Sequence, residues 1–220
     1  MLSISGMRGL IGKSLTPPVA ARFGAAFGSW LWTQRRPGND TSKPPTVALG
    51  RDSRQSGPMI EAAVVSGLAA TGCKVIRVGV LSTPGVAIAA NHLSADGGMV
   101  ITASHNPFPW NGIKSLRYDG VAPPPDQAND IIRRFNDNDF NYVGTQELLP
   151  VTDFPAGDKH HVDEVLALVD VDLIKSANLT ATVDSVHGAG GDEAKHLLHA
   201  LGVKLHHLYA EPTGDFPHTP

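Results

Sequence analysis

Short apolar runs rich in β-branched residues alternate with longer segments of helical periodicity in the first half of the chain. Runs typical of strands occupy residues 46–49, 74–80 and 99–103. Segments typical of helices occupy 58–71 and the stretch that follows a turn at 82–85 and ends at His92. Strands that alternate with helices usually form a parallel-type sheet whose faces the helices cover. The pattern therefore predicts an α/β fold, a three-layer domain with a mixed, mostly parallel sheet.

Weaker signals extend this pattern toward both ends of the chain. A strand is expected at 2–4, and a helix is expected to start at Thr16-Pro17, with Arg35-Arg36 in its last turn. Further elements are expected at 113–117 (strand), 126–135 (helix), 142–143 (possible strand), 158–169 and 172–177 (helices), 180–183 (strand), 192–201 (helix) and 203–208 (strand). The last of these predict the start of a second, similar α/β domain. We expect residues 1–150 to form the first domain and 151–220 to form an incomplete second domain.

Composition excludes several classes of protein. The 220 residues carry a net charge of −3, so no footprint for nucleic acid is visible, and no apolar run approaches the length of a membrane span. Cys73 is the only cysteine, which excludes an intrachain disulfide and suits a cytoplasmic protein. We expect Cys73 to be a buried core residue.

Residues 97–114, GGMVITASHNPFPWNGIK, contain the strongest candidate for chemistry. Ser104 stands where a buried strand ends, and Asn106-Pro107 favours a turn after it. Asn111-Gly112 predicts a second turn, directly before Lys114. Open parallel sheets bind ligands at the carboxyl ends of their strands, which is where this hydroxyl is expected.

The string TASHNP followed by NGIK closely resembles the active-site serine loop of the alpha-D-phosphohexomutases, which include phosphomannomutase, phosphoglucomutase and phosphoglucosamine mutase. In that family the serine gives a phosphate to the sugar and later takes one back, and the intermediate is a sugar bisphosphate. The resemblance implies that Ser104 is the phosphorylated residue. It also implies one Mg²⁺ ion, bound in part through the phosphate on Ser104, and a phosphorylated hexose as substrate.

Two further strings carry the resemblance in the first domain. SGMRG is similar to the family's first active-site loop, which places Arg8 at the site, and the glycines at 6, 9 and 12 are expected to make this loop flexible. GRDSR is similar to a family motif in which we expect Asp52 and Arg54 to hold loops together through charged hydrogen bonds. The resemblance thus implies catalytic roles for Ser104, His105, Lys114 and Arg8, and substrate contacts for Asn106, Arg8 and Lys114.

The second half of the chain carries weaker resemblances. DSVHGAGG is similar to a family turn that usually has Asn where His187 stands, and EPTGDFPHTP is similar to the loop after the following strand. The glycines at 188, 190 and 191 could cradle a phosphate, or they could simply form a tight strand-to-helix turn, which is the commoner case. Both readings stay open.

Three loops of the family are absent from the sequence: the DGDxDR-type metal loop, the GEESGH-like sugar loop and the RxSGTEP-type phosphate loop. We therefore expect the chain to be the N-terminal part of a four-domain mutase and to lack mutase activity alone. The identity of the hexose and the oligomeric state stay open. A non-catalytic phosphosugar-binding or regulatory module is the alternative, and a serine hydrolase is disfavoured because Ser104 lacks the G-x-S-x-G context.

Overall fold

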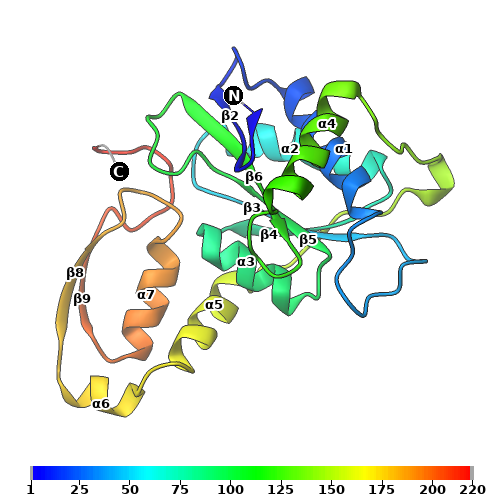
Figure 1. Ribbon diagram of the computed structural model, residues 1–220. Coiled ribbons are helices and arrows are strands. Elements are labelled where there is room, and N and C mark those ends of the chain that lie inside the picture. Colours follow the sequence, from blue (N-terminus) through cyan, green and yellow to red (C-terminus); the bar gives the residue numbers. More distant parts are fainter. Residues whose placement is uncertain (1, 219–220) are drawn as a thin grey trace.

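A seven-stranded sheet forms the centre of the computed structural model, which describes residues 2–218 (Figure 1). Its strands, in spatial order, are β1 (Leu2–Ser3), β2 (Gly6–Leu10), β6 (Trp110–Arg117), β5 (Gly97–Ile101), β3 (Thr46–Arg51), β4 (Lys74–Val80) and β7 (Thr152–Asp153). The pairs β5–β3, β3–β4 and β4–β7 are parallel, whereas β1–β2, β2–β6 and β6–β5 are antiparallel. All strands except β1 and β6 therefore point in one direction, and the mixed, mostly parallel sheet is confirmed.

Helices cover both faces of this sheet. The helices α1 (Pro17–Leu31), α2 (Gly57–Ala70) and α4 (Pro125–Asp137) pack on one face, and α3 (Thr83–His92) packs on the other. The strand residues alternate accordingly: Val47 and Leu49 join the core beneath α1 and α2, while Ala48 between them joins the core beneath α3. Cys73 lies in the first of these cores, as predicted. The three-layer α/β architecture is confirmed.

The first helix ends earlier than its sequence indicates. α1 stops at Leu31, so Arg35 and Arg36 lie beyond it and not in its last turn. The buried carboxylate of Asp96 explains their position: Arg35 Nε lies 3.0 Å from Asp96 Oδ1, and the main-chain N–H groups of Arg36 and Thr46 donate to the same carboxylate at 3.1 and 2.9 Å. A tertiary ion pair has overridden the local preference of a basic residue for the end of a helix.

Three local expectations from the sequence are wrong. The glycine-rich segment around Arg8 is strand β2, not a flexible loop, because it pairs along its length with β6. Asn111-Gly112 lies inside β6 instead of forming a turn. No strand forms at Tyr142-Val143, although Val143 donates a main-chain hydrogen bond to Ala70.

A smaller unit follows the large sheet. Its elements are α5 (Gly157–Leu166), α6 (Val171–Ser176), β8 (Thr180–Asp184), α7 (Gly191–Ala200) and β9 (Lys204–Leu208), preceded by a short 3₁₀ turn at Thr145–Glu147. β8 and β9 form a separate parallel sheet, whereas β7 still belongs to the large sheet, three residues past position 150. α5 packs against both α3 and α7 and so joins the two units. Within residues 2–218, no helix is long and apolar enough to span a lipid bilayer.

Candidate functional site

Ser104 lies in the turn that follows β5, at the carboxyl end of the parallel strands. The residue is exposed, and its backbone adopts the left-handed conformation with φ of 57°. The left-handed conformation is energetically unfavourable for a residue other than glycine, and it persists only where surrounding contacts fix the backbone. The position is therefore set by specific contacts and not by the local preference of a serine.

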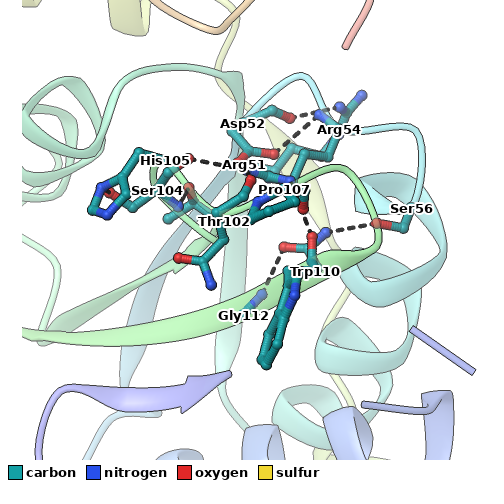
Figure 2. Close-up of polar contacts among 12 residues, drawn as sticks. Arg51, Asp52, Arg54, Ser56, Thr102, Ser104, His105, Pro107, Trp110 and Gly112 are labelled. Atoms are coloured by element: carbon teal, nitrogen blue, oxygen red, sulfur yellow. Dashed lines mark hydrogen bonds and ion pairs between the residues drawn. The ribbon is translucent and has the colours of Figure 1, made fainter. Parts of the chain in front are cut away.

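Hydrogen bonds hold both main-chain groups of Ser104 (Figure 2). Its N–H donates to Thr102 Oγ1 at 2.9 Å, and its carbonyl oxygen accepts from Arg54 Nη2 at 3.0 Å. The side-chain Oγ lies 3.3 Å from His105 Nδ1. The main chain is thus fixed, while the hydroxyl stays open to solvent beside a group that can carry a proton.

The buried side chain of Arg54 holds the serine turn in place through hydrogen bonds to its main chain. Its side chain is 1% exposed, and its Nε lies 3.1 Å from Asp52 Oδ2. Its two terminal nitrogens donate to four main-chain carbonyl oxygens, those of Ser104, Asn106, Pro107 and Trp110, at 2.7 to 3.2 Å. The expectation that Asp52 and Arg54 hold loops together is confirmed, and a planar guanidinium with five donors suits that task.

Arg8 and Lys114 project from neighbouring strands. Arg8 on β2 pairs with Gly112 on β6, and Lys114 lies two residues further along β6, on the same face of the sheet. Arg8 Nη1 donates to Asn106 Oδ1 at 3.1 Å, which ties the β2 strand to the serine turn. Burial lowers the pKa of Lys114 from its usual value, and the positive charge of Arg8 lowers it further.

Two adjacent cavities flank the turn. One of about 280 Å³ is lined by Arg8, Lys114 and Thr102, together with residues of the first hairpin. The other, about 170 Å³, is lined by Ser104 and Thr102 from the large domain and by Gly188 and Gly190 from the second unit. Thr102 borders both cavities, so the predicted cations and the predicted nucleophile lie on the two sides of one threonine.

The structure places the sequence-predicted residues in two adjoining groups. Arg8 and Lys114 line the first cavity, and Ser104 lines the second with His105 beside it. The hydrogen bond from Arg8 to Asn106 links the first group to the serine turn. Sequence reasoning missed Thr102, whose hydroxyl holds the serine N–H; a threonine two residues before a serine in a turn is a recognisable signal for such a bond.

The glycine-rich turn of the second unit faces the serine. Val186 and His187 both adopt left-handed conformations, with φ of 45° and 56°, and the N–H of Gly188 donates to the carbonyl of Ser185. These contacts belong to a tight strand-to-helix turn. The same turn lines the Ser104 cavity, so a role in binding phosphate stays a hypothesis.

Metal ligands are scarce in this part of the chain. Among residues 2–218, no group of three or more His, Cys, Asp or Glu side chains is placed to hold an ion. Asp52 lines the Ser104 cavity, but its carboxylate is engaged by Arg54.

A family model described as phosphoglucomutase/phosphomannomutase, alpha/beta/alpha domain I, matches residues 3–142. Among curated proteins, the chain is 39% identical to a phosphoglucomutase/phosphomannomutase of Thermococcus kodakarensis over 96% of its own length and 45% of the relative's. It is 35% identical to a phosphoglucosamine mutase of Staphylococcus saprophyticus, over 95% of its own length and 45% of that protein. The chain therefore spans less than half the length of these relatives.

Two solved structures share the fold of this chain over a little less than half of their own length. A phosphoglucomutase/phosphomannomutase family protein from Burkholderia thailandensis superposes with a TM-score of 0.74 and 31% identity, over 99% of this chain and 46% of that one. A Thermus thermophilus protein described as a candidate phosphomannomutase superposes with a TM-score of 0.80, over 96% of this chain and 46% of its own, at 24% identity, which supports the fold alone.

Proposed function

Because the chain belongs to the phosphoglucomutase/phosphomannomutase family, we propose that Ser104 carries the phosphoryl group that a hexose-phosphate mutase exchanges with its sugar. One observation carries the proposal: an exposed serine hydroxyl stands on a turn whose main chain is fixed by Thr102 and Arg54, next to the Arg8 and Lys114 cavity. A fixed donor beside positive charge is what phosphoryl transfer requires of a protein.

The transfer needs few covalent steps. The bond between phosphorus and Ser104 Oγ breaks, a bond to a sugar hydroxyl oxygen forms, and the proton of that hydroxyl is released. His105 Nδ1, 3.3 Å from Ser104 Oγ, is the group placed to supply a proton to the departing serine oxygen. The sugar bisphosphate then turns around, and its other phosphate returns to Ser104 by the same steps in reverse.

Arg8 and Lys114 supply the positive charge that the phosphates require. Charge spreads over the three equatorial oxygens during the transfer, and fixed cations stabilise it best in a cavity poor in water. Asn106, held by Arg8, would contact the hydroxyls of the sugar or its phosphate. The substrate class is a phosphorylated hexose.

Magnesium does not fit the residues of this segment alone. Mg²⁺ prefers about six oxygen ligands, and a phosphate on Ser104 would give only one or two. Because no set of three ligating side chains exists within residues 2–218, the remaining ligands would have to come from elsewhere in a complete enzyme. The ion would then offset charge on the transferring phosphate.

The whole activity is proposed for a complete protein in the cytoplasm, which would interconvert hexose 1-phosphate and hexose 6-phosphate. This chain, which covers 45% of its relatives, is proposed to take up phosphate without completing the isomerisation. The missing groups are those that would position the distal phosphate and the sugar.

Mass spectrometry after incubation with glucose 1,6-bisphosphate tests the proposal. One phosphate should appear on Ser104 and should be lost in Ser104→Ala. Ser53→Ala is the matched control, because Ser53 lines the same cavity and its buried hydroxyl has no hydrogen-bond partner. Phosphate that persists unchanged in Ser104→Ala would overturn the proposal.

A further inference from the structure

Residues 211–217, which we name the strap, run from the second unit onto the first. The strap follows β9, and Figure 1 shows the red end of the chain rising from that strand toward the large domain. It is anchored in the second unit at both ends of a short turn: Gly214 N–H donates to the carbonyl of His187 at 3.0 Å, and the His187 Nδ1 lies 2.8 Å from the carbonyl oxygen of Glu211.

Gly214 allows the strap to touch the main chain of the large domain. It is buried and adopts a left-handed conformation with φ of +72°. A Cβ atom at this position would lie 2.1 Å from the carbonyl oxygen of Ser53 and 3.0 Å from the Cα of Arg54. Only glycine permits this conformation together with such a close approach, so the strap is fitted to the loop that carries Arg54.

Phe216 covers Arg54 itself. The Arg54 Cζ atom lies 5.0 Å from the centroid of the Phe216 ring. The in-plane donors of the guanidinium are used by Asp52 and by the four carbonyl oxygens of the serine turn, which leaves its flat faces for an aromatic ring. The ring keeps water from a charge whose hydrogen bonds hold Ser104, and it also lines the Ser104 cavity.

We propose that Phe216 is a positioning residue for phosphoryl transfer at Ser104, acting from the second unit through Arg54. By covering the guanidinium, it favours the one arrangement in which Arg54 reaches all four carbonyl oxygens of the turn. The link makes the geometry of the serine depend on the docking of the strap. The proposal rests on the proposed function only for its effect on transfer, because its effect on the turn can be measured without any substrate.

Hydrogen exchange followed by mass spectrometry tests the structural part on the full chain without ligand. In Phe216→Ala, amides in residues 103–110 should exchange about tenfold faster, which corresponds to ~1.4 kcal/mol of lost local stability. Amides of β5 and of α7 should exchange as before. Phe216→Trp should restore protection, because Trp is the best partner for a cation, and Gly214→Ala should reproduce the loss by displacing the strap.

Val203→Ala is the control for general damage to the second unit. Val203 is buried just before β9, and it takes part in none of the contacts described above that anchor the strap through His187, Ser53 and Arg54. This variant should leave residues 103–110 protected. Unchanged exchange of this segment in Phe216→Ala, or equally fast exchange in Val203→Ala, would overturn the proposal.

The initial rate of phosphate uptake by Ser104 from glucose 1,6-bisphosphate is the second readout. Phe216→Ala should lower it about tenfold and Phe216→Trp should restore it, in proportion to the change in exchange. If the unchanged chain takes up no phosphate, the proposed function fails while the exchange result still decides the structural link. If exchange changes as expected and uptake does not, the positioning role is wrong.

Discussion

Arg54 Nη2 lies 3.0 Å from the carbonyl oxygen of Ser104, although the two residues are fifty positions apart in the sequence. The contact reaches the main chain of the serine and leaves its side chain free. The turn is therefore held by a buried cation on one side and is open to a substrate on the other. This division between a fixed backbone and an exposed hydroxyl suits the phosphate exchange proposed for Ser104.

Replacing Arg54 should damage both the fold and the serine turn. Arg54→Met leaves Asp52 Oδ2 and four carbonyl oxygens without their donor, although the main-chain N–H of residue 54 still donates to Asp52 Oδ1. We expect the free energy of unfolding to fall by about 3–5 kcal/mol. Urea unfolding followed by tryptophan fluorescence measures it. Arg77→Met is the control, since the Arg77–Asp153 pair is exposed and should contribute less than about 1 kcal/mol. Equal losses in the two variants would contradict this account of Arg54.

A methyl group at position 112 should disturb the packing of β2 and of the segment around Thr102 against β6. A Cβ atom on Gly112 would lie 2.7 Å from the carbonyl oxygen of Met7 and 2.8 Å from that of Thr102. Gly112→Ala should therefore push β2 away from β6 and cost about 1–3 kcal/mol of unfolding free energy, measured in urea.

The matching control for Gly112 lies on the neighbouring strand. Gly98→Ala places its Cβ at 3.4 Å or more from its neighbours, an ordinary contact distance. This change should be neutral or should stabilise the protein by up to about 1 kcal/mol, because alanine restricts the unfolded chain. A larger loss in Gly98→Ala than in Gly112→Ala would show that the spacing of β2 and β6 is not what matters.

Lys114 should titrate below its usual pKa of 10.5, because burial and then the charge of Arg8 both disfavour its protonated form. A titration of the lysine Cε resonances by NMR, assigned with Lys114→Gln, measures the midpoint. Arg8→Gln should raise the midpoint toward 10.5 without restoring it fully, since burial remains. Arg133→Gln, which removes an exposed charge that is paired with Asp130 and Asp139, should leave the midpoint unchanged. A shift equal to that in Arg8→Gln would contradict the assignment.

The same shift sets the sign of a pH effect on stability. The unfolded chain binds the Lys114 proton more tightly than the folded chain, so stability rises with pH between the folded pKa and the unfolded one. Binding of inorganic phosphate should change in the opposite sense, weakening as the pH rises through the folded pKa, because Lys114 loses its charge. Phosphate binding that strengthens over this interval would exclude Lys114 as a ligand.

The chain alone should not turn over hexose phosphate. A coupled assay with Mg²⁺ and glucose 1,6-bisphosphate should detect no conversion of hexose 1-phosphate to hexose 6-phosphate above background, because residues 2–218 provide no set of metal ligands. A full-length mutase is the positive control. Robust turnover that disappears in Ser104→Ala would show that fewer groups are needed than we expect.

Local pattern predicted most of the central fold. The runs around 46–51 and 97–101 are strands whose β-branched and small residues are buried on both faces, whereas the run at 74–80 keeps Lys74, Arg77 and Gly79 exposed; both compositions are visible in the sequence. β2 was not predictable in this way. GMRGL has little strand propensity, and its structure comes from pairing with β6, about a hundred residues away.

The site likewise combines features that the local sequence reveals with contacts that come from distant segments. The serine turn could be located from TASHNP, but the contacts that fix it come from distant segments. Asn111-Gly112 illustrates the limit: the pair is a strong turn signal in isolation, yet Gly112 is needed in a strand because it lies against two other backbones. Phe216 lies in a string that resembles a family loop, but nothing in that string pointed to Arg54, because the contact depends on which cation lies beneath the ring.

The pairing of β2 with β6 has a consequence for what this segment can distinguish. Arg8 and Lys114 are held at a fixed register and repel each other until an anion lies between them. Folding therefore already includes the unfavourable free energy of bringing the two charges together, and a bound anion would relieve it. Such a pair recognises charge and not the stereochemistry of a ring. We therefore expect the Arg8 and Lys114 cavity to accept the phosphate of any hexose, with discrimination between epimers arising wherever the sugar hydroxyls themselves are contacted.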